Sequence, residues 1–386
     1  MAVDLAPSVE SLTTPERTGA DLPRASALGA ATASSFRRRG LVVALIPAHN
    51  EEEQIEAAIR SLHDQESPPD LVVVCADNCT DGTAEKAEAM GAFVFETVGN
   101  RHKKAGALNQ VLEIALPELS DEDAVLVMDA DSVLAPTFLA EARRRLRDGI
   151  GGVGGTFTGR SGGGFVGMLQ RNEYARYARD VGRIKGKVLV LTGTATLFSA
   201  RTLRHVVWAR AEGVLPGGRG QVYDTNVLTE DNELTLALLH LGYKVVSPKG
   251  CRLTTEVMES WGDLYRQRLR WKRGALENLR DYGLTRITVK YWARQLFTFF
   301  GLLVTAAYLL SLGWSLAVDG TIHVQPIWLT VTGIFVLERV ATVRARGPLQ
   351  MALAATLLVE MTFDFFLQAV HGKAIVDTLM NNERTW

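Results

Sequence analysis

Between residues 41 and 147, short apolar runs alternate with amphipathic stretches, and this alternation constrains the fold more than any other feature of the sequence. The apolar runs have the length and β-branched content of buried strands, whereas the stretches between them have helical periodicity. The predicted strands are 41–47, 71–76, 93–97 and 124–128, and the predicted helices are 52–63, 84–90, 105–116 and 136–147. Strands joined by helices form right-handed crossovers, which predict an α/β domain with a mostly parallel sheet.

Polar residues follow these strands, and sheets of this kind bind ligands beyond the carboxyl ends of their strands. Pro47 and Glu51 belong to the polar run after the first strand, and Asp77 comes directly after the second. Because a carboxylate only accepts hydrogen bonds, Asp77 can accept the imide hydrogen of uracil. Asp81 stands where the next helix begins, and we predict that it caps that helix. Pro47, Glu51 and Asp77 are therefore candidates for binding a nucleotide.

Asp129 and Asp131 leave the end of the apolar run 124–128. Two carboxylates at such a position can hold a hard divalent cation, whose open coordination positions take diphosphate oxygens. The cation would neutralise charge on a departing nucleoside diphosphate. We predict a Mg²⁺ or Mn²⁺ site on Asp131 with Asp129 beside it. An Asp-x-Asp triplet also occurs in loops and helix caps, which is the alternative.

Lys104 stands at the start of the predicted helix 105–116. A cation and free backbone amides at a helix start favour an anionic partner, so we predict that Lys104 binds an anionic donor substrate. The alternative is an ordinary surface lysine, which is what we predict for its neighbour Lys103.

The triplet 229–231 leads into a predicted helix at 233–241. A carboxylate held there can accept the proton of a hydroxyl whose oxygen attacks an anomeric carbon, so Asp231 is the candidate base, with Glu230 beside it. Acidic residues at a helix start are also stabilising through the helix dipole alone, which is the structural alternative. Gly193 and Thr194 follow a predicted strand at 187–191 and would put small residues where an acceptor approaches.

The run Gln-Arg-Leu-Arg-Trp at 267–271 lies in a stretch that we predict to be an amphipathic helix. On a helix Gln267, Arg270 and Trp271 share one face, because residues three and four apart are neighbours. An arginine suits bidentate contact with phosphate, and an indole face suits the apolar face of a sugar ring. A basic amphipathic helix on anionic lipid is the competing interpretation.

The C-terminal part has the composition of a membrane region. Residues 296–318 form an uncharged apolar run, and about twenty such residues span a bilayer. Further candidate spans are 326–343 and 349–370, the latter carrying Glu360 and Asp364. Lys and Arg flank the first span on one side and follow the second, so the catalytic part is predicted to be cytoplasmic in a multi-pass cell-membrane protein. Glu360 and Asp364 either line a conduit or contact another helix or subunit, with Arg339 as a possible partner, or pack against protein or the membrane interface.

The remaining features narrow the class of protein. A net charge of −1 gives no global attraction for nucleic acid, and 47% hydrophobic residues suffice for a large core. The three cysteines, Cys75, Cys79 and Cys251, have no zinc spacing and are predicted to be buried free thiols. The glycine-rich run 162–167 is predicted to be a flexible loop before a helix at 168–180, not a dinucleotide site.

The motifs, taken in order, resemble those of membrane-embedded family 2 glycosyltransferases of the processive polysaccharide-synthase type. Members include synthases of hyaluronan, chitin, cellulose and poly-N-acetylglucosamine, and the resemblance covers residues 41–274. It implies a Rossmann-like, nucleotide-sugar-binding domain of the GT-A type that binds a UDP-sugar and inverts the anomeric carbon, with Asp231 as base. It also implies that Arg268 or Arg270 holds the diphosphate, and that Trp271 with Gln267 binds the acceptor sugar.

Four parts are therefore expected along the chain. They are a disordered tail at 1–40, a GT-A domain at 41–260, interfacial helices at 261–294, and a membrane region at 295–386 with two or three transmembrane helices. So few spans predict a homo-oligomer or a partner if a polysaccharide is exported. The alternative is a nonprocessive enzyme that adds one or a few sugars to a lipid-linked acceptor. A catalytically silent receptor or scaffold is a rival of another class, although the acidic positions are all retained.

Overall fold

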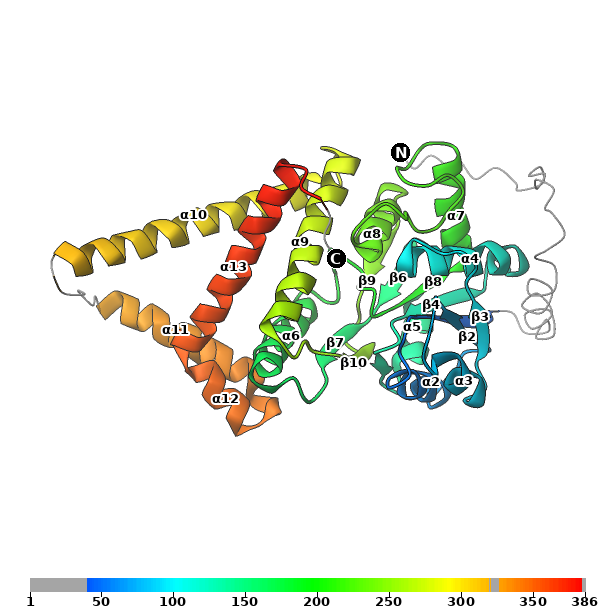
Figure 1. Ribbon diagram of the computed structural model, residues 1–386, viewed down its shortest axis with the longest axis horizontal. Coiled ribbons are helices and arrows are strands. Elements are labelled where there is room, and N and C mark those ends of the chain that lie inside the picture. Colours follow the sequence, from blue (N-terminus) through cyan, green and yellow to red (C-terminus); the bar gives the residue numbers. More distant parts are fainter. Residues whose placement is uncertain (1–39, 319, 321–325, 384–386) are drawn as a thin grey trace.

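The computed structural model describes residues 40–318, 320 and 326–383 (Figure 1). The predicted disordered tail therefore lies outside the described residues, apart from Gly40, and so does most of the connection at 319–325. The described cysteines are free, as predicted; Cys75 and Cys251 are buried, whereas Cys79 is only partly buried.

A seven-stranded sheet forms the centre of the catalytic part (Figure 1). Its first four strands in sequence are mutually parallel, and their positions agree with the predicted ones to within one residue. The remaining three extend the sheet beyond β4, with β8 antiparallel to both of its neighbours and β9 parallel to β6. In sheet order the strands are β3 (Phe93–Glu96), β2 (Leu71–Ala76), β1 (Val42–Ala48), β4 (Ala124–Met128), β8 (Ala195–Ser199), β6 (Ile150–Gly154) and β9 (Lys244–Val246).

Helices cover both faces of this sheet, because alternate residues of the buried strands point to opposite sides. Val43 and Leu45 of β1 belong to the apolar core under one set of helices, and Ala44 and Ile46 belong to the core under the other. The first set is α4 (Lys103–Glu118), α7 (Ala200–Ala211) and α8 (Glu230–His240), and the second is α2 (Ile55–His63), α3 (Thr83–Ala89) and α5 (Phe138–Arg145). The polar residues at the ends of β1, β2 and β4 line a cleft.

The strand predicted at 187–191 is wrong. Lys187 makes only an isolated bridge to Val246, and the strand is β8, which begins after Gly193 and Thr194 instead of before them. The apolar run was misleading because it packs as irregular chain: the Leu191 amide donates to Thr235 Oγ1 at 3.0 Å, and the Leu189 carbonyl accepts from Tyr291.

A small second sheet lies beside the ends of the main strands. It contains β5 (Val133–Leu134), β10 (Arg252–Thr255) and β7 (Thr156–Gly159), and α6 (Gly164–Arg183) follows β7. The glycine-rich run was predicted to be a loop before a helix at 168–180, but the helix begins earlier, at Gly164. Gly162 and Gly163, at the turn into α6, have φ of 112° and 64°. Residues with a Cβ rarely adopt these positive φ values, which favours glycine at both positions.

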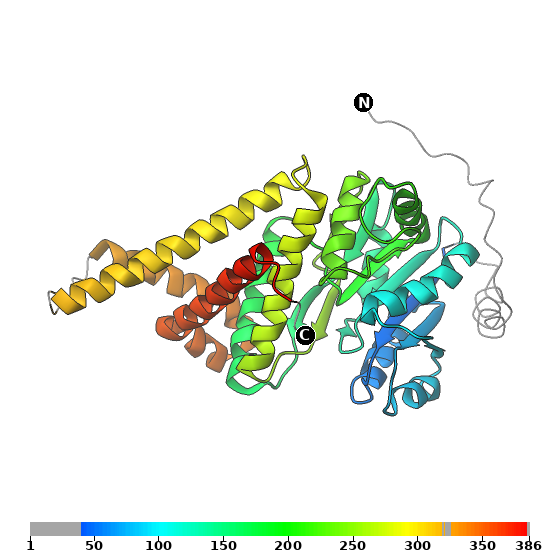
Figure 2. The same cartoon turned by 45° about the horizontal axis from the view of Figure 1, so that its top comes forward.

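The chain continues into a group of C-terminal helices, some of which pack against α6 and α8. They are α9 (Trp261–Tyr282), α10 (Val289–Val318), α11 (Pro326–Val343), the short η1 (Arg344–Arg346), α12 (Pro348–Ala355) and α13 (Leu357–Leu379). α13 runs beside α9, whereas α10 extends away from the catalytic part (Figures 1 and 2). By length and composition, no single helix within the described ranges could cross a membrane. The helices Pro348–Ala355 and Val359–Leu379, which are bent by 72° relative to each other, together have the length and composition of a membrane span.

Glu360 and Asp364 face helices of the same chain. Glu360, 1% exposed, contacts Arg176 of α6 at 2.7 Å and also Arg339 of α11, so the pairing with Arg339 is confirmed. Asp364 contacts Arg339 at 2.6 Å. Asn172 of α6 donates to the second oxygen of Glu360 at 3.2 Å. This charge network fastens α11 and α13 to α6.

Candidate active site

A cleft of about 890 Å³ opens where β1, β2 and β4 end, between the main sheet, α8 and α9. Its volume lies within the range of small-molecule sites. Thirteen of the fourteen predicted site residues line this cleft, although they come from positions 47 to 271 of the chain. They are Pro47, Glu51, Asp77, Lys104, Asp129, Asp131, Gly193, Thr194, Glu230, Asp231, Gln267, Arg270 and Trp271.

Asp77 stands at one end of the cleft, directly after β2. Three donors converge on its Oδ1, from Thr97 at 2.7 Å, Asn100 at 2.8 Å and Asn78 at 2.9 Å. Within the described residues, its Oδ2 has no protein donor, and this oxygen is available for a ligand. Asp81 instead accepts from the amide and hydroxyl of Thr83 at the start of α3, which confirms its structural role.

Asp129 and Asp131 follow β4 and place two carboxylates in the middle of the cleft. Asp131 Oδ1 accepts from Ser132 at 3.0 Å and from Thr255 of β10 at 3.1 Å. Burial raises the pKa of both aspartates, that of Asp129 to about 6. Burial, followed by the negative charge of Asp131, raises the pKa of Glu51 to about 7. Burial is the main cause of all three raised pKa values, and the charges of neighbouring carboxylates add to it.

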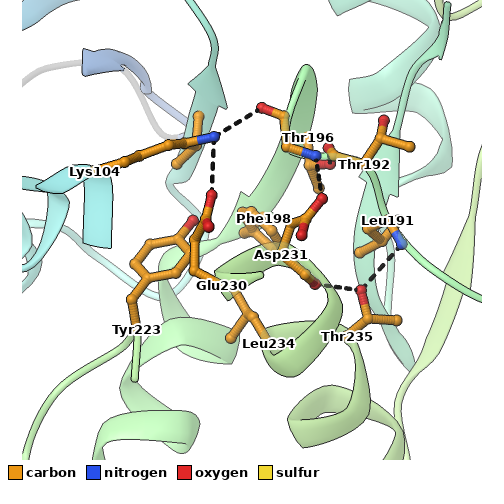
Figure 3. Close-up of a pocket in the computed structure, with 12 residues that line it drawn as sticks. Lys104, Leu191, Thr192, Thr196, Phe198, Tyr223, Glu230, Asp231, Leu234 and Thr235 are labelled. Atoms are coloured by element: carbon orange, nitrogen blue, oxygen red, sulfur yellow. Dashed lines mark hydrogen bonds and ion pairs between the residues drawn. The ribbon is translucent and has the colours of Figure 1, made fainter. Parts of the chain in front are cut away.

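Lys104 is held between acidic side chains instead of projecting into solvent. Its Nζ lies 2.5 Å from Asp129 Oδ1. It also lies 3.1 Å from Glu230 Oε1 and 3.4 Å from the Gly193 carbonyl (Figure 3). Burial alone would lower the pKa of Lys104, but the two carboxylates outweigh it and raise the pKa well above its usual value. A Cβ at Gly193 would lie 2.8 Å from Nζ, so a larger residue there would displace the Lys104 ammonium from its present position.

Asp231 lies in the first turn of α8, beside Glu230. Its Oδ2 accepts from the Gly193 amide at 2.8 Å (Figure 3), and its Oδ1 accepts from the Asn232 amide at 2.7 Å. Burial, followed by the negative charge of Glu230, raises the pKa of Asp231 to about 6. A carboxylate with that pKa is ionised near neutral pH and yet binds a proton more strongly than an exposed one, which suits a general base.

Helix α9 presents Gln267, Arg270 and Trp271 to the cleft, as the helical spacing predicted. Arg268 does not line it. The Arg268 side chain is 2% exposed, and its Nη2 pairs with Glu173 of α6 at 2.8 Å. The predicted donor contact of Arg268 is therefore wrong for this structure, because the helix turns it into the protein, and Arg270 is the arginine that faces the cleft.

Several lining residues escaped the sequence analysis. Arg101 and Lys103 line the cleft as well, so Lys103 is on the surface as predicted but belongs to the cleft rather than to an unrelated part of the surface. Their position beside Lys104 was the available signal. Tyr174 and Glu256 come from α6 and the end of β10. Neither carried a recognisable motif, because the second sheet brings them to the cleft from distant parts of the chain.

The carboxylates suit a hard cation, but they do not form a complete protein cage. Among the described residues, no group of three or more His, Cys, Asp and Glu side chains is arranged to hold a metal ion. Mg²⁺ commonly uses one or two carboxylates together with water and substrate phosphates. Asp129 and Asp131, whose pKa values burial raises, therefore fit a cation that is shared with a diphosphate.

Comparison with known proteins agrees with this geometry. A family model described as "Glycosyltransferase like family 2" matches residues 39–274. Poly-beta-1,6-N-acetyl-D-glucosamine synthases of Staphylococcus aureus strain COL and Staphylococcus epidermidis are each 27% identical to the chain over 257 and 256 residues. Each match covers 64% of this chain, and 58% and 57% of the relatives respectively, so it spans little more than half of their length.

The fold is similar to that of a solved glycosyltransferase. The mannosyltransferase PcManGT from Pyrobaculum calidifontis, in complex with GDP-Man and Mn²⁺, matches with a TM-score of 0.53 and 20% identity. The match covers 93% of this chain and 99% of that one. The catalytic part therefore has the Rossmann-like GT-A fold that the sequence predicted.

Proposed function

Because the chain belongs to glycosyltransferase family 2, we propose that it is a metal-dependent, inverting transferase that moves a sugar from UDP to a hydroxyl of a growing polysaccharide or membrane-proximal glycan. One observation carries the proposal. A single cleft is lined by Asp77, by the carboxylate pair Asp129 and Asp131, by the candidate base Asp231, and by Arg270 and Trp271 of α9.

The donor would lie along the strand ends. Asp77 would accept the uracil imide hydrogen through Oδ2, with Pro47 and Glu51 beside the nucleotide. Arg270 would bind the diphosphate, and the two other basic side chains that line the cleft, Arg101 and Lys103, would add positive charge to it.

A Mg²⁺ or Mn²⁺ ion would be held by Asp131 and Asp129. When bound, it supplies positive charge that stabilises the departing diphosphate. The fit rests on the two buried carboxylates of Asp129 and Asp131 at the end of β4, whose negative charge a cation would offset. Lys104 already offsets part of that charge at Asp129, and Glu230 holds Lys104 from the other side.

Asp231 would act as the base. The acceptor hydroxyl oxygen forms the new bond to the anomeric carbon from one face, the bond to the diphosphate oxygen breaks on the opposite face, and the hydroxyl proton moves to Asp231. Two backbone amides hold the Asp231 carboxylate in place for this transfer. Trp271 and Gln267, on the same face of α9, would bind the acceptor sugar together with Gly193 and Thr194.

We further propose that the C-terminal helices attach the enzyme to the cell membrane with the cleft on the cytoplasmic side. The support is the apolar surface of α10, where Phe297, Leu310 and Trp314 are 77%, 75% and 72% exposed. Large apolar side chains exposed to this extent along one helix are typical of a surface that lipid or protein covers. Export of a polymer would then require a second copy of the chain or a partner protein.

A nonprocessive transfer to a lipid-linked acceptor is the second candidate. It is favoured by the compact packing of α11 and α13 on α6 and α9 of the same chain. Product size separates the two. Membrane-embedded protein is incubated with UDP-sugars and Mn²⁺, and labelled product is sized on a gel. Long product supports a synthase and short or lipid-bound product supports the second candidate, whereas absence of UDP release with every sugar would contradict the proposed donor.

A further inference from the structure

We propose that Arg268 is a positioning residue that orients both acceptor-side residues of α9, Gln267 and Trp271, without contacting either substrate. This proposal rests on the proposed function only in that Gln267 and Trp271 are there assigned to the acceptor sugar. The contacts that carry it are properties of the fold, and they can be tested without any transfer reaction.

Arg268 lies underneath the cleft wall instead of in it. Its side chain is 2% exposed, and it does not line the cleft, whereas Gln267, Arg270 and Trp271 of the same helix do. Glu173 of α6 binds its Nη2 at 2.8 Å. A guanidinium that is buried and ion-paired has no free fork for a phosphate, so its function must act through other residues.

Two contacts connect Arg268 to the residues that do face the cleft. Its Nη1 donates to Gln267 Oε1, which leaves the amide NH₂ of Gln267 as the end that can donate to a sugar hydroxyl. Its Cζ lies 4.3 Å from the centroid of the Trp271 ring, a cation–π contact with one face of the indole. One buried side chain thus fixes an amide rotamer and an indole plane.

The anchor of Arg268 is itself rigid. Glu173 belongs to α6, and its neighbours Asn172 and Arg176 are both bound to the buried Glu360 of α13. Tyr174, also on α6, places its ring 5.6 Å from the Arg268 guanidinium. Because α6 is held to α13 by these contacts, Glu173 holds the guanidinium of Arg268, and therefore the indole of Trp271, in one position.

The test compares a charge-neutral pair of substitutions with matched controls. Arg268→Met with Glu173→Gln removes both charges together, because removal of Arg268 alone would leave an unpaired carboxylate partly buried. Met also removes the Arg268 Nε, which has no hydrogen-bond partner in the described part of the chain. Arg266→Met is the control, since Arg266 is 68% exposed and, among the residues that the structure describes, its ion pair is with Asp263 of its own helix. Arg270→Met is the opposite control, because Arg270 faces the donor.

The first readout does not require activity. Fluorine NMR of fluorotryptophan-labelled protein gives a Trp271 line, identified by its absence in Trp271→Phe. We expect that line to shift and broaden in the double variant and to stay unchanged in Arg266→Met. An unchanged Trp271 line in a folded double variant overturns the proposal. Because this readout is independent of turnover, failure of the proposed function would not be mistaken for failure of the positioning role.

The second readout is the division of the kinetic effect. With β-1,6-linked N-acetylglucosamine oligosaccharides as acceptor probe, the double variant should raise the acceptor KM about tenfold and change the donor KM less than twofold, where tenfold corresponds to about 1.4 kcal/mol. Arg270→Met should do the reverse. A donor KM that rises in the double variant as much as in Arg270→Met would assign Arg268 to the donor and overturn the proposal.

Discussion

Replacement of Asp231 by Asn should make the protein more stable while nearly abolishing transfer. The pKa of Asp231 rises from 3.8 to about 6, so the folded state disfavours the ionised carboxylate. A difference of about 2 units at 1.36 kcal/mol per unit is roughly 3 kcal/mol. Asn avoids this penalty but loses one of the two amide hydrogen bonds to Asp231, which costs about 1 kcal/mol. The net expectation is a gain of about 2 kcal/mol at neutral pH.

The sign of the effect depends on pH. An acid whose pKa is raised by folding destabilises the folded state above that pKa, and the penalty disappears as pH falls toward the ordinary value of 3.8. Melting of chelator-treated protein should therefore show Asp231→Asn several degrees above the parent at about pH 7.5, and a much smaller difference at about pH 4. Turnover should fall roughly a hundred- to ten-thousand-fold.

Two results would refute this reasoning. Near-normal turnover of Asp231→Asn would remove Asp231 as the base. A variant that melts below the parent at neutral pH would show that burial and Glu230 do not strain this carboxylate as the structure indicates. Donor binding, measured by titration with UDP in the presence of Mn²⁺, serves as the control and should be retained.

Four further predictions follow from the same contacts. Turnover of the parent should decrease about tenfold per pH unit below about 6, in a kcat profile, because protonated Asp231 cannot accept the hydroxyl proton. Arg270→Met should raise the donor KM roughly ten- to a hundredfold in steady-state kinetics, since hydrogen bonds to charged groups contribute about 1.5–3 kcal/mol. Chelation, or Asp131→Asn, should weaken UDP binding in calorimetry and abolish transfer; full activity in excess chelator would exclude the assigned metal role. Glu360→Gln should remove the carboxylate that Arg176 and Arg339 share, leave Arg339 paired with Asp364, cost about 1.5–3 kcal/mol, and make α11 and α13 more sensitive to limited proteolysis, whereas an unchanged digestion pattern would show that Glu360 does not hold them to α6.

The sequence predicted the first half of the catalytic fold closely, because each strand there is a buried run with a polar residue at its end. The same logic failed at 187–191, where an apolar run packs against α8 as irregular chain and Thr235, not a neighbouring strand, satisfies the Leu191 amide. Burial of apolar side chains explains hydrophobicity without requiring a strand.

The site was predictable to the extent that single elements present it. Gln267, Arg270 and Trp271 share a helical face, and that periodicity is visible in sequence. It cannot show which of two arginines turns inward, since this depends on Glu173 of a different helix. Glu256 was missed for the same reason, because β10 approaches the cleft only through pairing with β5 and β7.

The most direct test of the central claim is release of UDP by membrane-embedded protein across a panel of UDP-sugars with Mn²⁺ or Mg²⁺, read together with product size and with Asp231→Asn beside it. We predict metal-dependent UDP release with a particular sugar, formation of a glycosylated product, and loss of both in the variant. Release that is unaffected by chelator or by Asp231→Asn, or no release with every sugar despite UDP binding, would contradict the account.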